Sequence, residues 1–343
     1  FEGETALLEL VNQMDGKQDF SKVPNLIYRQ NGKITVNQPF YSENINQLTA
    51  PNYDGFPLDL YLSPEPVLPV QFSRGCYYKD CAFCALTLDH QNFRQRDPGK
   101  TVDDLVWLKE RYGAQSFFFT DECFALSPTK RLCQQMIDRQ VNVKWTCELR
   151  FEKNLTRELL GQMRDAGCLK IVFGLESFNQ RVMDFMKKGI KQESVRRIVD
   201  DCVDLGIAVH CYVIVGFPTE KEEEALDTMN FVVGNKKLHE SYGFSCQPCL
   251  FDLEKEAPIM SDPGSYGIRR IMRPATEDLS LGFFYEVQEG MTPAQAEQLY
   301  QQVYEKISEV VCELPFNYSM ADGLLYIARA KSQALQVPQP TGS

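Results

Sequence analysis

Apolar and polar positions alternate in a regular way from residue 67 onward. Short runs rich in β-branched and aromatic residues are each followed by a segment whose apolar residues recur every three or four positions, which is typical of a strand and then an amphipathic helix. The predicted strands are residues 67–73, 115–120, 142–149, 169–176, 208–217 and 242–248. The predicted helices are residues 101–112, 128–140, 156–166, 178–188, 192–206 and 219–234, with Thr101 and Thr156 as caps. The pattern therefore predicts six consecutive strand–helix units.

Apolar strands joined by single helices indicate parallel pairing, because each crossover returns the chain to the same end of the sheet. A doubly wound sheet and a barrel, complete or partial, both fit this order, and periodicity does not choose between them. In either α/β fold, ligands gather at the carboxyl ends of the strands. We therefore expect the chemistry of this protein at that edge.

The two ends of the chain differ from the repeat. GETALLELVNQMDG predicts a helix that stops at Gly16, and the first residue is Phe rather than Met, which indicates a fragment or a processed chain. Residues 250–290 are rich in Pro, Gly and aromatic residues and predict a covering segment, after which Thr292 and Pro293 are typical of a helix start. The predicted organisation is a connector over 1–65, the strand–helix domain over 66–250, an α-rich extension over 251–335 and a disordered tail over 336–343.

Composition narrows the class of protein. The chain has 343 residues, 43% of them hydrophobic, which is enough for one large core or two domains. A net charge of −11 and a pI near 5.0 argue against a nucleic-acid partner, which would need a basic face. No window approaches the roughly 18 apolar residues of a membrane span, and the opening residues do not form a signal peptide. We expect a cytoplasmic protein that binds neither nucleic acid nor membrane.

The twelve cysteines are spread through predicted strands and helices, which favours reduced thiols over a disulfide framework. Seven sit singly among apolar neighbours and are interpreted as small buried hydrophobes: Cys123, Cys133, Cys147, Cys168, Cys202, Cys211 and Cys312. RGCYYKDCAFCAL, residues 74–86, is different, because Cys76, Cys81 and Cys84 stand together directly after the first predicted strand. Thiolates at such spacing converge on one metal centre.

Two kinds of metal centre suit this loop. A structural zinc site needs four protein ligands, and His90 is the nearest candidate for the fourth. An iron–sulfur cluster held by three cysteines instead leaves one iron open to a small molecule. The local set of three thiols favours the cluster, with zinc as the alternative.

The loop resembles the cluster loop of the radical S-adenosylmethionine (SAM) superfamily. There the cysteines follow the first strand of a partial (β/α)6 barrel, and an aromatic residue commonly precedes the third cysteine, as Phe83 precedes Cys84. The usual loop has three residues between its first two cysteines, whereas this one has four, Tyr77 to Asp80. The resemblance covers roughly residues 66–250 and implies an α/β fold with a partial (β/α)6, TIM-like barrel.

Further residues match the family's pattern at the ends of successive predicted strands. The resemblance implies contacts to the SAM amino acid and ribose from polar side chains, to its carboxylate from a lysine, and to its adenine from a glycine turn. The residues implied are Phe83, Thr120, Asp121, Glu122, Glu148, Glu176, Lys188 and Gly216, beside the metal ligands Cys76, Cys81 and Cys84. The family's glycine pair after the second strand is absent. Taken singly, most of these residues fit solvated strand ends, a surface lysine or a turn; their common order favours the family.

The resemblance implies a 4Fe–4S cluster whose open iron binds SAM, and one-electron reduction that cleaves SAM to a 5′-deoxyadenosyl radical. That radical abstracts hydrogen from a carbon of the substrate. A one-electron reductant such as flavodoxin or ferredoxin is implied as a partner. No catalytic residue is assigned. His210, Cys211, Tyr212 and Tyr242 lie on late strands as candidates for hydrogen or proton transfer, and alternation sends only every second one inward.

The opening FEGETALLELV, with Gly3 and Glu4, resembles the connector that joins a cobalamin-binding domain to the barrel in the cobalamin-dependent class. Many members of that class are C-methyltransferases. The long cysteine loop and PGSYGI favour the branch that modifies ribosomally made peptides. Cobalamin use is left open, because the chain shows no DxHxxG-like element for the corrin.

CQPC, with Cys246 and Cys249, has the spacing of an auxiliary cluster site. Residues three apart on a strand point to opposite faces, so the two thiols converge only if Pro248 bends the chain, and Cys312 is the one obvious additional thiol. Buried thiols are the simpler interpretation.

Three hypotheses follow. The first is a radical SAM enzyme, with or without cobalamin, that modifies a small-molecule or peptide substrate by C-methylation or another reaction. The second is a zinc-stabilised α/β binding protein. The third is a degenerate homologue that binds cluster and SAM without turnover. Iron content, colour and formation of 5′-deoxyadenosine separate them.

Overall fold

The computed structural model describes residues 2–16, 18–37, 42–61, 65–86, 92–240, 244–273 and 281–310. The chain divides into two compact units, residues 1–49 and a unit that begins at Ala50. The first unit contains α1 (Glu4–Asp15), which ends at Gly16 as predicted, and the antiparallel hairpin β1 (Ile27–Gln30) and β2 (Lys33–Val36). The apolar residues Leu7, Leu8, Val11 and Met14 of α1 are exposed.

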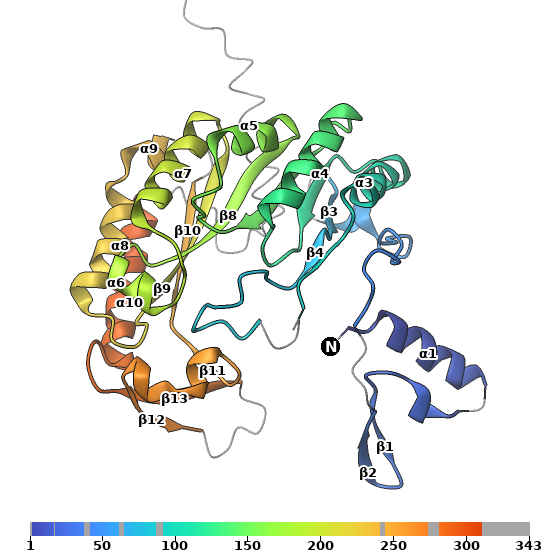
Figure 1. Cartoon of the computed structure of the whole chain (residues 1–343), viewed down its shortest axis with the longest axis horizontal. Helices are drawn as coiled ribbons and strands as arrows, with labels where there is room; N and C mark the ends of the chain where they lie inside the picture. The colour runs from blue at the N-terminus through green and yellow to red at the C-terminus, as the bar shows by residue number, and fades with distance from the viewer. Residues whose placement is uncertain are drawn as a thin grey trace, which may run out of the picture. The chain divides into compact units, whose positions relative to one another are not determined.

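Six parallel strands form the central sheet of the second unit (Figure 1). They are β3 (Val67–Val70), β6 (Ser116–Phe119), β7 (Lys144–Leu149), β8 (Cys168–Glu176), β9 (Ala208–Val215) and β10 (Ser245–Leu250). All six predicted strands are confirmed. The last begins at Ser245, and residues 242–243 of the predicted run lie outside the described residues. Strand β4 (Ser73–Arg74) follows β3 along the chain and forms a short antiparallel pair with β5 (Arg94–Gln95).

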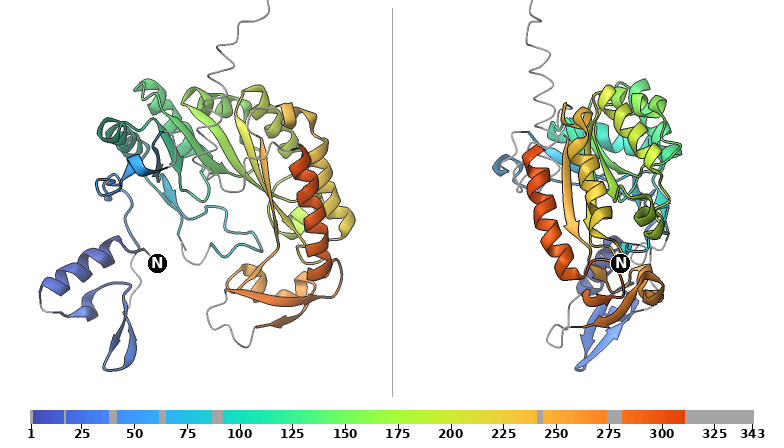
Figure 2. Two further views of the ribbon diagram at one scale, coloured as in Figure 1. Left: turned by 180° about the vertical axis from the view of Figure 1, so that it is seen from behind. Right: turned by 90° about the vertical axis from the view of Figure 1, so that its left-hand side faces the viewer.

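The spatial order of the strands decides between the two architectures that periodicity left open. The order is β3-β6-β7-β8-β9-β10, which is also their order along the chain. A doubly wound sheet reverses direction at a switch point, whereas a sequential order keeps every crossover helix on one face. Figure 2 shows the helices along the outer face of a curved sheet. The predicted partial (β/α)6 barrel is confirmed.

The helices of the second unit follow the predicted segments closely. Six of them are α3 (Pro98–Tyr112), α4 (Leu126–Asp138), α5 (Arg157–Asp165), α6 (Gln180–Phe185), α7 (Gln192–Asp204) and α8 (Glu222–Gly234). The short helix α9 (Lys236–Glu240) was not predicted. Thr156 caps α5 as predicted and accepts from the Leu159 amide at 3.3 Å. Thr101 as a cap is wrong: α3 begins at Pro98, and the Asp97 carboxylate accepts from the Lys100 amide, because proline suits the first helical position.

The core lies between the sheet and its outer helices. Large side chains such as Phe117, Trp145 and Phe173 are fully buried there. Trp145 also donates its indole N–H to the Ala166 carbonyl at 2.9 Å. Six of the seven cysteines interpreted as buried hydrophobes are buried, and Cys312 lies outside the described residues. Most of these thiols pack as small apolar side chains, whereas the Cys123 thiol also donates a hydrogen bond to the Cys76 sulfur.

The chain after β10 forms a second, smaller sheet. Strands β11 (Leu253–Glu254), β13 (Gly282–Val287) and β12 (Ile268–Met272) pair in that order and antiparallel. Helix α10 (Pro293–Val310) then packs against α8 and β10 (Figure 2). Thr292 caps it as predicted, since the Gln295 amide donates to the Thr292 hydroxyl. The described part of the extension is thus mixed rather than purely α-rich.

The domain boundaries at residues 65, 250 and 335 remain predictions. Within the described segments, no helix is long and apolar enough to cross a membrane.

Candidate functional site

The loop with the three cysteines leaves β4 at the carboxyl edge of the sheet and is anchored on one side by the turn after β6. The Asp121 carboxylate accepts from the Phe72 amide at 2.9 Å and from the Ser73 hydroxyl at 2.6 Å. The Glu122 carboxylate accepts from the Gly75 amide at 3.0 Å. TDEC therefore supports the start of the cysteine loop through two of its side chains.

The other side of the loop is held by the turn after α6. The Ala82 amide donates to the Met186 carbonyl at 2.9 Å, and the Tyr78 hydroxyl donates to the Lys187 carbonyl at 2.9 Å. Gly189, with φ of 68°, lies so close to the Tyr78 hydroxyl that an added Cβ would meet it at 2.1 Å. The turn thus requires a glycine here, and the loop is fixed between the turn after β6 and the turn after α6.

The three thiols differ in their surroundings. The pKa of Cys76 is lowered to about 6, because the Cys123 thiol and then the amides of Tyr78 and Lys79 donate to its sulfur. Burial raises the pKa of Cys84 to about 11. Burial also raises the pKa of Cys81, against the opposing charges of Lys188 and Arg150. Cations and N–H donors around sulfur favour the thiolate form that binds metal.

Three thiols on one loop are the donors of an iron–sulfur cluster that leaves one iron open, because each thiolate binds a different iron. Across the described ranges, no three His, Cys, Asp or Glu side chains converge closely enough to hold one metal ion. His90, the candidate fourth zinc ligand, lies outside the described residues.

A buried ion pair lies next to the loop. Lys188 Nζ is 2.8 Å from Glu176 Oε1, both residues are less than a tenth exposed, and the ammonium lies 5.5 Å from the centre of the Phe83 ring. Burial lowers the pKa of Lys188, but the charges of Glu176 and Cys81 outweigh it, so the net shift is upward. The backbone of Glu176 has a φ of 61°, which is strained for a non-glycine residue.

Gly174 makes room for that pair. A Cβ at this position would lie 2.5 Å from Glu176 Oε1 and 2.7 Å from Lys188 Nζ. The family resemblance implies separate contacts of Glu176 and Lys188 with SAM, and the structure brings these two side chains together beside Phe83.

Thr120 and Glu148 complete the set on the β6 and β7 side. Thr120 is exposed, and its hydroxyl donates to the Val70 carbonyl at 3.3 Å. Glu148 is half-buried, and burial followed by the charges of Glu122 and Glu176 raises its pKa to about 7. A carboxyl group with such a pKa can hold or release a proton near neutral pH.

Gly216 follows β9 at its carboxyl end. Its φ is 84°, and its amide donates to the Glu220 carboxylate at 2.7 Å. An added Cβ would meet the Ala296 Cβ of α10 at 2.4 Å. The turn is therefore closed on one side by the C-terminal helix.

Strand alternation sorts the candidates for proton transfer on β9. His210 and Tyr212 share the inner face, where their rings form an edge contact with centres 4.9 Å apart. Cys211 points outward into the core. Tyr242 lies outside the described residues.

CQPC does not bend. β10 pairs with β9 without interruption from Ser245 to Leu250, with Pro248 in register with Val213. Cys246 packs against the core, and Cys249 is exposed and donates to the Val213 carbonyl at 3.3 Å. The strand geometry supports separate thiols over an auxiliary cluster.

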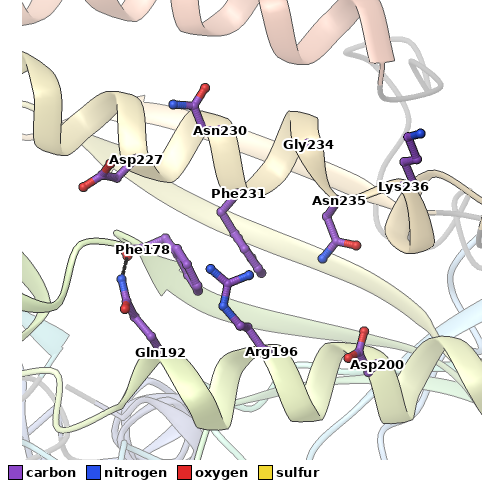
Figure 3. A pocket seen from close by; sticks show the side chains of 10 residues that line it. All are labelled: Phe178, Gln192, Arg196, Asp200, Asp227, Asn230, Phe231, Gly234, Asn235 and Lys236. Carbon is purple, nitrogen blue, oxygen red and sulfur yellow. Dashed lines mark hydrogen bonds between the residues drawn. The ribbon is translucent and has the colours of Figure 1, made fainter.

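A cavity of about 590 Å³ opens on the outer surface between α7 and α8, away from the predicted site residues (Figure 3). The rings of Phe178 and Phe231 stack with centres 3.8 Å apart, and the Arg196 guanidinium lies 4.5 Å from the Phe178 ring centre. Its lining carries both charge signs, and we assign it no role.

Arg150 is the site residue that sequence reasoning missed. It follows β7 directly, is 5% exposed, and reaches the cysteine loop at Tyr78 and Cys81. Its position could have indicated a role, because Arg150 directly follows Leu149, the last residue of β7. In this class of fold the functional residues lie at the carboxyl ends of the strands.

Comparison with known proteins agrees with this geometry. The family model described as "Radical SAM superfamily" matches residues 70–232. An "Uncharacterized methyltransferase PH0819" of Pyrococcus horikoshii is 28% identical over 246 residues, which are 70% of this chain and 52% of that protein. This chain thus spans about half the length of that relative.

Two solved structures share the fold. The cobalamin-dependent S-adenosylmethionine radical enzyme OxsB, with aqua-cobalamin and SAM bound, matches with a TM-score of 0.67 at 15% identity, over 97% of this chain and 54% of its own. The radical S-adenosylmethionine methyltransferase TsrM of Kitasatospora setae, with cobalamin and a [4Fe-4S] cluster bound, gives 0.61 at 17% identity, over 97% and 76%. The loop, the sheet and the family match agree, and the chain carries a domain of the radical SAM superfamily over residues 70–232.

Proposed function

We propose that this chain is the barrel of a radical SAM enzyme that binds a 4Fe–4S cluster through Cys76, Cys81 and Cys84 and methylates carbon in a peptide or another natural product. One observation carries the proposal. The loop with the three thiols is fixed between the turn after strand β6 and the turn after helix α6, next to the buried Lys188–Glu176 pair. This arrangement brings three metal ligands and a paired cation and anion to the ligand-binding edge of the barrel.

The chain's own residues would bind and orient SAM. The Lys188 ammonium suits the SAM carboxylate, and the Glu176 and Glu148 carboxylates suit its amino group and ribose hydroxyls. Thr120 is exposed at the same edge. When bound, the reduced cluster supplies the electron that cleaves SAM to a 5′-deoxyadenosyl radical. Asp121 and Glu122 hold the loop, and we propose that this support is their main role.

Methylation and cobalamin are supported by the relatives. The Pyrococcus protein and TsrM are both called methyltransferases, and both solved enzymes contain cobalamin. We propose the same chemistry for this chain, with an electron from a flavodoxin- or ferredoxin-type reductant. The cytoplasm, where thiols stay reduced, suits such a cluster.

The test uses anaerobically reconstituted protein. We expect a brown chain with about four irons and 5′-deoxyadenosine formed from SAM under a strong reductant. A Cys76→Ala, Cys81→Ala, Cys84→Ala variant should lose both. Cys133→Ala, which removes a fully buried thiol far from the loop in sequence, is the matched control and should keep both.

Three outcomes would contradict the proposal. One is a triple variant that still binds iron and cleaves SAM. The second is a colourless wild-type protein with one zinc, which would select the zinc-stabilised binding protein. The third is a chain that binds cluster and SAM without turnover, which would select the degenerate homologue.

A further inference from the structure

Arg150 connects three segments around the cysteine loop. Its guanidinium carbon lies 3.4 Å from the centre of the Tyr78 ring, and its Nη1 donates to Cys81 Sγ at 3.7 Å. Its Nη2 donates to the Lys188 carbonyl oxygen. One side chain thus joins β7, the middle of the cysteine loop and the turn after α6.

The positive charge of Arg150 is only partly balanced by nearby carboxylate. Its Nε faces Glu152 Oε1 at 3.4 Å as an ion pair without a hydrogen bond. That carboxylate also accepts from the Tyr77 hydroxyl and is 25% exposed. A guanidinium keeps its proton even when buried, so the charge persists beside the sulfur. Cys81 Sγ is the loop sulfur that this guanidinium reaches directly.

The other buried cation at the site is already paired. Lys188 Nζ lies 2.8 Å from Glu176 Oε1, and its carbonyl, not its ammonium, meets Arg150. Arg150 is therefore the cation that makes a direct bond to a cluster cysteine within the described residues.

We propose that Arg150 is a positioning residue for the cluster, one that orients the Cys81 side of the loop and raises the reduction potential through its charge and its N–H···S bond. This inference rests on the proposed function. Hydrogen bonds and positive charge at cluster sulfurs stabilise the reduced, more negative state, and residues behind metal ligands govern how firmly the metal is held.

The experiment compares the reconstituted wild-type chain with the variants Arg150→Gln, Arg150→Lys and Arg157→Gln. Arg157 is half exposed and pairs with Asp201 and Asp204, so its variant makes the same change in net charge away from the loop. The readouts are iron per chain, iron release to a chelator, and the midpoint potential from a redox titration followed by electron paramagnetic resonance.

We expect Arg150→Gln to shift the midpoint potential to more negative values and to release iron ~10-fold faster. Arg150→Lys keeps the positive charge but loses the planar guanidinium, so its midpoint potential and its rate of iron release should lie between those of Arg150→Gln and wild type. Arg157→Gln should match wild type. If circular dichroism shows that Arg150→Gln does not fold, the proposal is tested by whether Arg150→Lys has a more negative midpoint potential than wild type.

Wild-type potential and iron retention in the folded Arg150 variants would overturn this inference alone. A wild-type chain that takes up no cluster would overturn the proposed function instead. A loss of thermal stability without any change in potential would reduce Arg150 to a packing role and would also overturn the inference.

Discussion

Two buried lysines lie near opposite ends of strand β8, Lys170 within the strand and Lys188 in the turn after α6, and their pKa values are shifted in opposite directions. At the carboxyl end, Lys188 is 6% exposed, pairs with Glu176 at 2.8 Å, and has a raised pKa. Near the amino end, Lys170 is 3% exposed, and its ammonium donates to the Ser245 hydroxyl at 3.4 Å. Burial lowers the pKa of Lys170 to about 8.

The difference shows that oppositely charged side chains are paired at one end of the barrel and not at the other. The carboxyl end collects paired charges around the cysteine loop, where an ionic ligand can exchange with them. The amino end keeps a cation with a serine and the neutral ring of His210, whose pKa is lowered to about 3 by burial and by Lys170. A buried charge without a carboxylate is costly, so the two lysines should respond in opposite ways to removal.

The largest effect is expected for Lys188→Met. It leaves the Glu176 carboxylate buried without its partner, so the free energy of unfolding should fall by about 3–5 kcal/mol at pH 7. Urea unfolding of the metal-free chain measures it. Lys191→Met is the control, because Lys191 pairs with Asp184 in solvent and should change stability by about 0.5 kcal/mol or less. Equal losses in the two variants would break the contrast.

Lys170→Met should act in the other direction. The pKa of Lys170 in the folded protein, about 8, lies below the ordinary value of 10.5. At pH 7 the lysine is therefore charged in both the folded and the unfolded protein, and the folded protein bears the full cost of burying that charge. The free energy of unfolding of the variant should be about 2–3 kcal/mol higher than that of wild type at pH 7. From pH 8 to 10.5 the native wild type releases its proton first, so this gap should shrink.

Denaturant curves at pH 7 and pH 10 test that pH dependence. Ser245 keeps its 2.8 Å bond to His210 Nδ1 in this variant, so no new orphaned group obscures the result. A destabilised Lys170→Met protein at pH 7 would show that the amino end is also built on a paired charge.

A smaller effect is expected for Gly174→Ala, which sharpens the contrast by disturbing the pair without removing a charge. The new Cβ would displace both Glu176 Oε1 and Lys188 Nζ, at a cost of about 1–3 kcal/mol. Gly161→Ala is the control, because this position in α5 has open space and alanine favours helices. A thermal melt in which Gly174→Ala is as stable as wild type would mean that the pair adapts freely.

Local patterns predicted much of this molecule. The six strands follow from apolar runs, and Thr156 as a cap follows from its position before an amphipathic helix. Thr101 failed as a cap because Asp97 and Pro98 upstream form a better helix start. The antiparallel sheet of β11, β12 and β13 was not predicted, since its pairing joins residues that are distant in sequence and carries no short-range signal.

The candidate site divides in the same way. Spacing alone singled out Cys76, Cys81 and Cys84, because metal ligands on one loop must be close in sequence. The hydrogen bond between Lys188 and Glu176 could not be predicted from the sequence, because α6 lies between the two residues and only its packing brings them together. Arg150 was missed for a similar reason: its contacts with Tyr78 and Cys81 span about seventy residues.

The sequence by itself determined the class of fold, the three-cysteine loop and the edge of the sheet at which it lies, because each depends on periodicity or short spacing. Tertiary structure alone decided which charges are paired. Two buried lysines look alike in sequence, yet one faces a carboxylate and the other a serine. Burial strengthens electrostatic interactions, so the partner that packing supplies sets the state of each group.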